Sequence, residues 1–234
     1  GLHCENTEFR ANEANAGGAV YLARQSYQLR SMFQKANASS NRFISNDALY
    51  GPDVASDGAS MDWSSASPLR SVVRTGSELG PVVGNNSSSV PAVRVSVFDH
   101  FNQTVRWLAI PTAFVLELLD DSKADLIGST RTTLTSQGDV SFSGVRIAGE
   151  LGNHSIRVIA QQLQSSDLVL QSPVFNLSLA GCGPGEFLTE GVQSEHGVCR
   201  RCAANQYGLD GVNCKLCPPG AVCREGTIEV SNRF

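Results

Sequence analysis

Residues 9–14 read FRANEA and residues 43–48 read FISNDA, so one order of residue types returns 34 positions later. A glycine turn follows each copy, with GGAV at residues 17–20 and GPDV at residues 51–54. A repeat at this interval indicates a solenoid, in which each copy forms one coil and stacks on the next. In a parallel β-helix the phenylalanine can stack inside the coil and the asparagine can bond backbone groups at a corner. The glycine then permits the tight bend that follows.

The combination of Phe-x-x-Asn with Gly-Gly-Ala-Val resembles the repeat of polymorphic outer-membrane proteins, and related repeats occur in large surface proteins of algae and oomycetes. This resemblance to algal and protist surface proteins implies the last coils of a right-handed parallel β-helix, used for display and adhesion. The second copy departs from the pattern, because GPDV replaces GGAV, and this departure suits a terminal coil. The alternative is two similar turns that arose by chance in a loop-rich domain. Short strands are expected at residues 19–22, 27–29 and 42–45.

Residues 92–180 alternate between apolar and polar types, which is typical of an antiparallel β-sandwich. Val93, Val95 and Val97 are predicted to point to one side, with Arg94 and Ser96 on the other. Further strands are expected at residues 104–109, 113–119, 131–135, 140–147, 155–160, 168–170 and 174–179. Seven or eight short strands in one segment suit an Ig-like fold.

The Val-x-Val-x-Asp motif that begins this segment, with Gly138-x-Val140-x-Phe142 and Gly149-x-x-Gly152 further on, resembles the invasin and filamin type of Ig-like repeat. That resemblance implies a spacer or adhesion module and says nothing of a ligand.

Six of the seven cysteines lie in the last part of the chain, and four of them form a C-x2-C-x11-C-x2-C pattern. Such a pattern fits either disulfides or a zinc ribbon, and we favour disulfides because the rest of the chain indicates export. Six cysteines allow 15 pairings. Among them we favour one that closes neither CxxC loop, since such loops are usual only in redox motifs. This pairing is Cys182–Cys199, Cys202–Cys214 and Cys217–Cys223.

The seventh cysteine, Cys4, has no partner in this scheme. We expect it to pair with a residue before Gly1, and the alternative is a buried free thiol.

The cysteine spacing, together with the aromatic residue after each glycine turn and the Cys-Pro-x-Gly ending, is similar to the cysteine-rich repeat of ephrin receptors and tumour-necrosis-factor receptors. That similarity implies an elongated ladder of disulfides with little regular structure, in a module that often lies near a membrane. A module this small needs such bridges, because its core alone is too small to hold it folded.

N-x-S/T acceptors for N-linked glycans are frequent before the cysteine-rich tail and absent within it. This frequency is higher than we expect of a cytosolic protein, and an exported chain would oxidise its thiols. Two of the acceptors overlap, so we expect at most one of those two to be used. The predicted glycosylation sites are Asn37, Asn85, Asn86, Asn102, Asn153 and Asn176.

The totals exclude several classes of function. A formal net charge of −4 argues against a nucleic-acid partner, which would require a basic face. The chain has no run of about 18 apolar residues, so contact with a membrane is expected only through segments outside it. Both ends appear cut, and we interpret the chain as part of a longer protein.

Few residues are candidates for chemistry, and for each we prefer a structural interpretation. Glu13 and Asp47 hold equivalent places in the two repeats and could stack about 5 Å apart, the spacing of adjacent strands. Such a pair could be catalytic or could bind calcium, but a solvated turn is preferred. Residues 120–125 are interpreted as a polar hairpin rather than a calcium loop. The histidines are scattered and predicted to lie at the surface: His3, His100, His154 and His196.

The sequence therefore predicts an all-β, non-enzymatic structural or adhesive segment of a large extracellular glycoprotein, with no cofactor and with surface or matrix proteins, or glycans, as partners. One alternative is the exterior of a signalling receptor. Another is a carbohydrate-active β-helix enzyme, which would lose polysaccharide cleavage when Glu13 or Asp47 is neutralised. The expected segments are β-helix coils at 1–80, a linker at 81–91, a sandwich at 92–180, a cysteine-rich module at 181–225 and a tail or next element at 226–234.

Overall fold

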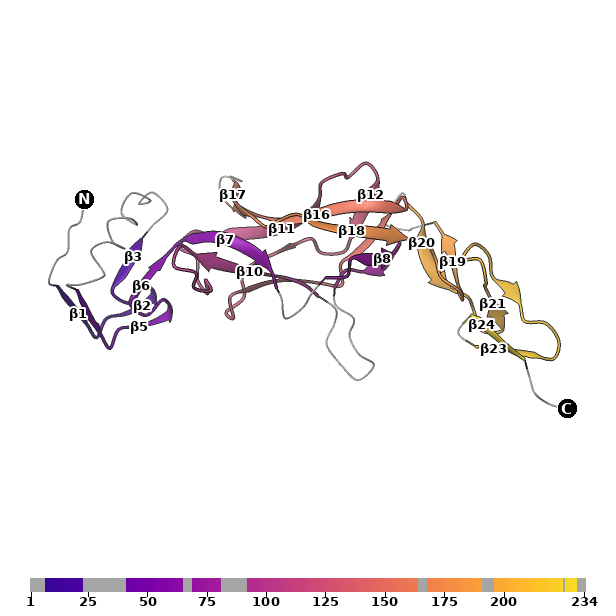
Figure 1. The fold of residues 1–234 in the computed structure, drawn as a ribbon, viewed down its shortest axis with the longest axis horizontal. Coiled ribbons are helices and arrows are strands. Elements are labelled where there is room, and N and C mark those ends of the chain that lie inside the picture. The colour runs from indigo at the N-terminus through magenta and orange to yellow at the C-terminus, as the bar shows by residue number, and fades with distance from the viewer. Residues whose placement is uncertain are drawn as a thin grey trace.

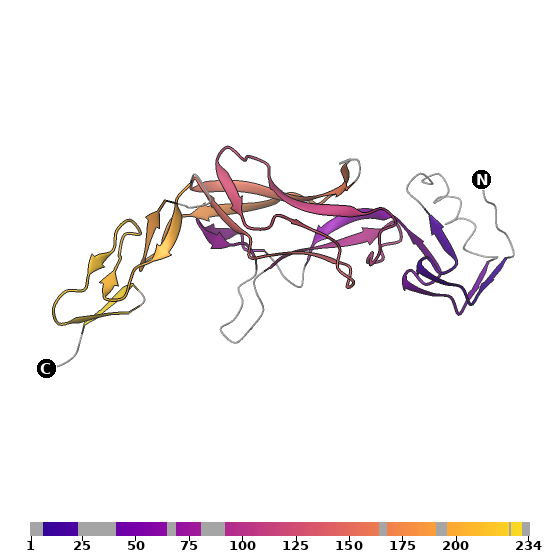
Figure 2. The same cartoon turned by 180° about the vertical axis from the view of Figure 1, so that it is seen from behind.

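The computed structural model describes residues 7–22, 41–64, 69–80, 92–163, 168–190, 196–224 and 226–230. All regular structure within these ranges is β-strand, so the predicted all-β class is confirmed. These ranges contain no helix that could span a membrane. The chain is elongated, with the first strands at one end and the cysteine-rich strands at the other (Figure 1, Figure 2).

The described part of the N-terminal end contains three short parallel strand pairs, and the partners in each pair are always 34 residues apart. Phe9 lies opposite Phe43 and Glu13 lies opposite Asp47, for example. The repeat read in the sequence is therefore also a repeat in the backbone. The pairs are β1 (Glu8–Arg10) with β4 (Arg42–Ile44), β2 (Glu13–Ala16) with β5 (Asp47–Tyr50), and β3 (Val20–Leu22) with β6 (Val54–Ser56).

Equivalent side chains of the two repeats contact each other. The rings of Phe9 and Phe43 stack with centroids 5.2 Å apart and an interplanar angle of 8°. The Oδ1 atom of Asn46 accepts hydrogen bonds from the backbone N–H (3.1 Å) and the side-chain amide (2.9 Å) of Asn12. The Asn46 Nδ2 atom donates to the carbonyl oxygen of Phe9, 3.2 Å away. Gly17 has a φ of +59°, and a Cβ there would lie 2.1 Å from the carbonyl oxygen of Val20, so the bend requires glycine.

The two asparagines should respond differently to removal of the side chain. Asn46→Ala leaves the Asn12 N–H and the Phe9 carbonyl without these partners, and we expect it to lower the free energy of unfolding by about 1–2 kcal/mol. Asn12→Ala removes one hydrogen bond, which is exposed, and should cost less than about 0.5 kcal/mol. Urea unfolding of both variants measures the difference, and equal losses would contradict the asymmetry.

The middle of the chain consists of packed β-sheets. One sheet has the order β14-β10-β7, a larger one has the order β13-β11-β16-β18-β8 with β17 paired to β16, and a third has the order β12-β15-β9. The strands are β7 (Gly58–Trp63), β8 (Val72–Arg74), β9 (Ser77–Glu78), β10 (Ala92–Asp99), β11 (Thr112–Leu118), β12 (Ala124–Ile127), β13 (Arg131–Thr132), β14 (Asp139–Ser143), β15 (Arg146–Gly149), β16 (Gly152–Gln162), β17 (Leu168–Gln171) and β18 (Phe175–Ala180).

The core lies between these sheets. Val93, Val95 and Val97 of β10 are fully buried, as their alternation predicts, because successive side chains of a strand point to opposite faces. They share one apolar cluster with Phe114 of β11 and Val158 of β16. The cluster also contains Met61 and Val73, and this ties β7 and β8 into the same core.

The predicted boundary at residue 80 is wrong. β7 pairs antiparallel with β10, β9 pairs antiparallel with β15, and β8 pairs parallel with β18, so all three belong to the packed sheets. The change from the parallel pairs to the packed sheets falls between Ser56 and Gly58. The sequence did not reveal β8 and β9, because both strands are too short to show an alternating pattern. The predicted linker at 81–91 lies outside the described residues.

Two strand predictions also need correction. Residues 104–109 contribute a single bridge, from Thr104 to Phe98, and no strand. Residues 140–147 form parts of two strands in different sheets, β14 and β15, with Gly144 at a φ of +68° between them. β12 was not predicted, because its four residues follow a polar turn directly. The predicted strand at 27–29 lies outside the described residues.

The cysteine-rich end contains three short antiparallel pairs. Its few buried side chains include Cys202 and Cys223, so sulfur supplies much of the small core. The pairs are β19 (Glu186–Thr189) with β20 (Val198–Arg201), β21 (Gln206–Tyr207) with β22 (Lys215–Leu216), and β23 (Ala221–Arg224) with β24 (Thr227–Val230).

Candidate functional site

Three disulfides hold the cysteine-rich end, and they are the three pairs favoured from the sequence, none of which closes a CxxC loop. Their Cα–Cα distances are 5.3, 5.6 and 5.8 Å, which are ordinary for disulfides. All six sulfurs are therefore bonded to each other in the structure, and none is a free thiolate of the kind that a zinc ribbon uses. In chain order the pairs are Cys182–Cys199, Cys202–Cys214 and Cys217–Cys223.

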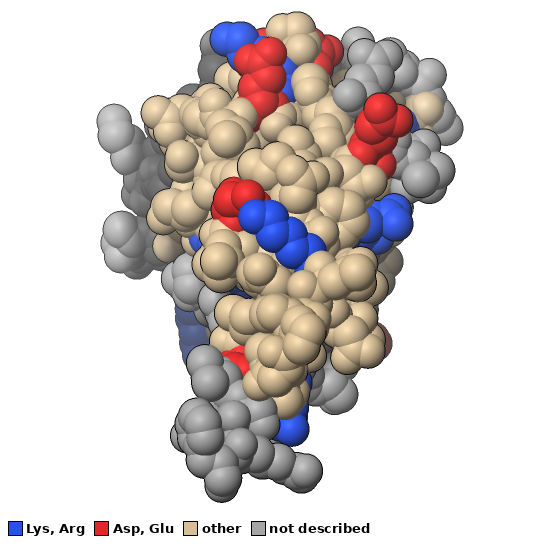
Figure 3. Space-filling view, turned by 90° about the vertical axis from the view of Figure 1, so that its right-hand side faces the viewer, with Lys and Arg blue, Asp and Glu red and all other residues tan. Residues whose placement is uncertain are grey.

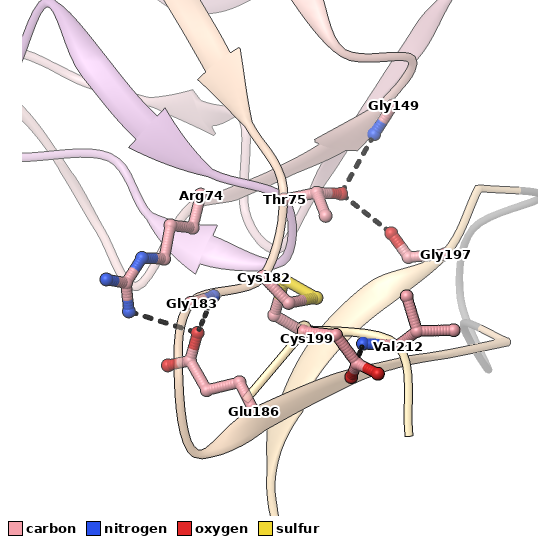
Figure 4. Close-up of a disulfide and its surroundings, with 10 residues drawn as sticks. Arg74, Thr75, Gly149, Cys182, Gly183, Glu186, Gly197, Cys199 and Val212 are labelled. Carbon is pink, nitrogen blue, oxygen red and sulfur yellow. Dashed lines mark hydrogen bonds and ion pairs between the residues drawn. A yellow bond between two sulfur atoms is a disulfide. The ribbon is translucent and has the colours of Figure 1, made fainter. Parts of the chain in front are cut away.

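The first disulfide lies where the cysteine-rich end meets the packed sheets, and Thr75 is the centre of this contact (Figure 4). The Thr75 hydroxyl donates to the carbonyl oxygen of Gly197 (2.7 Å) and accepts from the N–H of Gly149 (3.3 Å). Its carbonyl oxygen accepts from the N–H of Cys199 (3.0 Å), and its own N–H donates to the carbonyl oxygen of Ala180 (3.1 Å). Thr75 is 1% exposed. One buried residue thus joins β8, β15 and β18 to the segment that carries Cys199.

An exposed ion pair lies beside the hydrogen bonds of Thr75 (Figure 4). Arg74 Nη1 lies 3.0 Å from Glu186 Oε2, and that oxygen also accepts from the N–H of Gly183, 3.1 Å away. A Cβ on Gly183 would lie 2.6 Å from the Arg74 guanidinium. Exposed pairs are worth less than about 1 kcal/mol, so this pair orients the module more than it stabilises it.

Gly76 lies against Val198 in this junction. Its φ is +81°, and a Cβ there would lie 2.6 Å from the Cβ of Val198. We expect Gly76→Ala to lower the free energy of unfolding by about 2–3 kcal/mol, because it adds a clash to the cost of a left-handed φ. Gly144→Ala is the matched control, since Gly144 has a φ of +68° with nothing within 4 Å of its Cβ position. The control should lose only about 1 kcal/mol in thermal or urea unfolding. Equal losses of stability in the two variants would mean that Val198 can move away from the added Cβ at little cost.

The junction at the other end of the packed sheets depends on Asp99, which is 3% exposed. Its Oδ1 accepts from the backbone N–H groups of Phe101 (2.8 Å) and Gln103 (2.9 Å) and so forms the turn after β10. Its Oδ2 accepts from the backbone N–H of Ser56 (3.2 Å) and from Gln103 Nε2 (3.1 Å). Gln103 Nε2 also donates to the carbonyl oxygen of Val54, 2.9 Å away. The Asp99 carboxylate therefore joins β6, the last of the parallel strands, to the turn that follows β10.

Two tyrosines complete this second junction. The Tyr21 hydroxyl donates to the carboxylate of Asp57, and the Tyr50 hydroxyl donates to the carbonyl oxygen of Ser56, 2.7 Å away. The Tyr21 ring also meets Trp107 edge to face, with centroids 6.1 Å apart. Burial raises the pKa of both phenols above the usual value, and for Tyr21 the hydrogen bond to Asp57 raises the pKa further. Both hydroxyls therefore stay protonated and keep donating at neutral pH.

A small apolar cavity of about 40 Å³ lies beside this junction. Its lining includes Gly58, Val97, Leu108, Phe114 and Leu170. Its volume is far below the roughly 300 Å³ at which small-molecule pockets begin, so the cavity is a packing gap and not a substrate pocket.

The candidate acid pair does lie in register, since Glu13 of β2 faces Asp47 of β5. Both residues are exposed, and they border an open surface groove of about 470 Å³ lined by residues 13–15 and 47–49. No group of three or more histidine, cysteine or acidic residues that could hold a metal occurs among the described residues. Two carboxylates supply fewer oxygens than the six to eight that calcium takes.

The polar turn after β11 leads into β12, and because these two strands lie in different sheets, the predicted hairpin is wrong. Asp120 accepts a hydrogen bond from the Ser122 hydroxyl (2.8 Å) and lies 3.3 Å from Lys123 Nζ. The hydrogen bond from Ser122, with a further one from Lys123, holds the pKa of Asp120 below its usual value. The Asp120 carboxylate therefore finds its hydrogen-bond and ion-pair partners within the turn itself.

One histidine prediction is wrong, because His154 is buried, at 4% exposure. Its Nε2 lies 2.8 Å from the carbonyl oxygen of Glu150, and its Nδ1 is buried without a hydrogen-bond partner. The sequence predicted a surface position for His154, but β16 begins at Gly152 and the alternation of side chains along the strand points His154 inward. His100 and His196 are partly exposed, and His3 lies outside the described residues.

Three of the six predicted glycosylation sites can be placed. Asn102 lies in the turn after β10, with a φ of +60°, Asn153 is the second residue of β16 and Asn176 is the second residue of β18. All three are exposed. The other three sites, Asn37, Asn85 and Asn86, lie outside the described residues. Cys4 lies outside them as well.

The surface seen from the cysteine-rich end is mostly uncharged, and its basic and acidic side chains are interspersed (Figure 3). On this face the described residues form no large patch of one sign. No known protein family, no curated protein and no solved structure matches the chain.

Proposed function

We propose that this chain is a structural, adhesive segment of a large extracellular glycoprotein. In this proposal the parallel pairs are the last coils of a right-handed parallel β-helix, the packed sheets are an Ig-like sandwich, and the disulfide-bonded end is a cysteine-rich module. The three units act as one stiff rod that sets the distance between partners at its ends. The partners would be other surface or matrix proteins, or glycans.

The observation that carries this proposal is the pair of buried junctions. Asp99 bonds backbone groups on both sides of one junction, and Thr75 does so at the other. Domains joined by free linkers move relative to one another, whereas buried hydrogen bonds at a boundary resist bending. A chain with buried hydrogen bonds at the boundaries between its units is suited to bearing mechanical load or to holding two partners at a fixed distance.

The extracellular location is supported by the three disulfides and by the exposure of the three sequons that can be placed. The test is the intact mass of the protein secreted from a eukaryotic cell, before and after reduction and deglycosylation. We expect reduction to add six hydrogens at these bridges and deglycosylation to remove sugar mass. Alkylation of all six cysteines in native protein without a reductant would overturn the location and the rigid end together.

Stiffness is tested separately by small-angle X-ray scattering of the same secreted protein. A single elongated particle with a narrow distance distribution is the expected result. A broad distribution, of the kind given by units on free hinges, would contradict the rod even if the disulfides are intact.

A further inference from the structure

We propose that Asn153 and Asn176 form one composite N-glycosylation site, which accepts sugar only before strands β16 and β18 pair. This inference rests on the proposed extracellular function, because it concerns how a secreted chain acquires its glycans. Both acceptors would be modified only before folding, although they are 23 residues apart in the sequence.

The two sequons lie side by side in opposite directions. In the antiparallel register, Asn153 is opposite Ser178 and Ser155 is opposite Asn176, so each asparagine faces the hydroxyl residue of the other sequon. The Ser155 hydroxyl donates to Asn176 Oδ1 at 2.7 Å. Asparagines placed diagonally on one face of such a pair are about 7–8 Å apart. Glycans on both would therefore leave the sheet from nearly the same place.

The middle residues of the sequons face the core and lock this arrangement. His154 is 4% exposed and Leu177 is 2% exposed, so neither sequon can turn over without opening the core. Ser178 also donates its backbone N–H to Ser71, 2.7 Å away, on the other side of β18. Both acceptors are thus fixed in extended backbone, with neighbouring chain on at least one side.

The transfer reaction needs a more accessible segment. An oligosaccharyltransferase forms a bond between Asn Nδ2 and the anomeric carbon of a sugar, breaks the bond from that carbon to a lipid pyrophosphate, and releases the lipid pyrophosphate and one amide proton. The enzyme has to hold the asparagine and the hydroxyl residue together in its own cleft, which a strand bonded within a sheet cannot enter. Sequons are accordingly used mainly in accessible surface segments.

The glycans would have a clear physical role on the finished fold. Val72 lies opposite Ser178 on β8 and is 61% exposed, and Val174, just before β18, is 48% exposed. β8 is a short parallel strand at the edge of the large sheet. Sugars at the composite site would cover this apolar edge and prevent edge-to-edge association.

The test uses the whole chain, made without glycans, incubated with purified oligosaccharyltransferase and lipid-linked oligosaccharide. The unfolded substrate is Val158→Asp, which places a charge at a fully buried position of β16 outside both sequons. The control is Gln171→Asp, which adds the same charge at an exposed position of β17. Site occupancy is read by peptide mass spectrometry, and hydrogen exchange reports which substrates are folded. If Val158→Asp stays folded, a peptide of residues 150–181 replaces it.

We expect Asn153 and Asn176 to be modified at least about tenfold more in the unfolded substrate than in the parent and the Gln171→Asp control, since the ladder must open for access. Changing Ser155 and Ser178 together to threonine keeps both sequons and should not raise occupancy in the folded chain. Equal modification of folded and unfolded substrates at either site overturns the inference. The proposed function is judged by the secreted mass instead, so the two can fail separately.

Discussion

Replacing both Cys182 and Cys199 with alanine should destabilise the cysteine-rich module by about 3 kcal/mol and loosen it from the packed sheets. The bridge closes 17 positions of chain, and a loop of that length is worth about that much in lost freedom of the unfolded state. The module has few buried apolar residues to replace the bridge. The loss should therefore exceed that from most single surface changes.

The position of this bridge adds a second effect. Cys199 donates its N–H to Thr75, and Gly197 accepts from the Thr75 hydroxyl, so the bonded segment is also the one that contacts the sheets. Without the bridge, we expect β20 to fray and both hydrogen bonds to exchange faster. The effect should thus appear at the junction as well as inside the module.

Hydrogen exchange of residues 74–76 and 197–201, with urea unfolding, measures both effects. The matched control removes Cys217 and Cys223, whose bridge closes only 6 positions far from the junction. That pair should cost about 2 kcal/mol and leave the exchange at Thr75 unchanged. If the two double variants behave alike at Thr75, the first bridge has no special part in the junction.

Local patterns in the sequence predicted the structural features that depend on residues close together in the chain. The 34-residue repeat predicted the register of Phe9 with Phe43, because stacked coils place equivalent residues side by side. The period of two predicted the inward face of β10. The expectation that neither short CxxC loop closes agrees with the three disulfides. Each of these rests on geometry that a few residues fix on their own.

The junctions could not be predicted in this way. Thr75 follows a strand of three residues, and its partners Gly149 and Gly197 are 74 and 122 positions away. Asp99 is the last residue of β10, and its bond to Ser56 joins segments 43 positions apart. Nothing local marks a polar residue as buried when its partners come from another unit. His154 was misplaced for a different reason, because the predicted strand began at residue 155, whereas β16 begins at Gly152 and turns His154 inward.

Asp99→Ala should have the largest effect of any single substitution at the N-terminal junction. Removal of the carboxylate leaves the backbone N–H groups of Ser56, Phe101 and Gln103 without their acceptors, and Ser56 is 1% exposed. A buried donor without an acceptor costs about 1–3 kcal/mol, and hydrogen bonds to a charged acceptor are the stronger kind. We expect a loss of about 3 kcal/mol in the free energy of unfolding, a large part of the 5–15 kcal/mol typical of a domain.

Asp99→Asn separates the role of shape from that of charge. Its one remaining oxygen can still accept at the turn, but the amide nitrogen would face the Ser56 N–H as a second donor, so about half of the loss should remain. Urea unfolding gives the totals, and hydrogen exchange in β6 shows where the structure opens. We expect the amides of residues 54–56 to lose protection in the alanine variant before those of β10 and β16 do, because the parallel strands depend on Asp99 while the sheet core does not. A uniform loss of protection across all strands would mean that the junction and the packed sheets unfold as one unit, and that the proposed rod has no separate joint at this position.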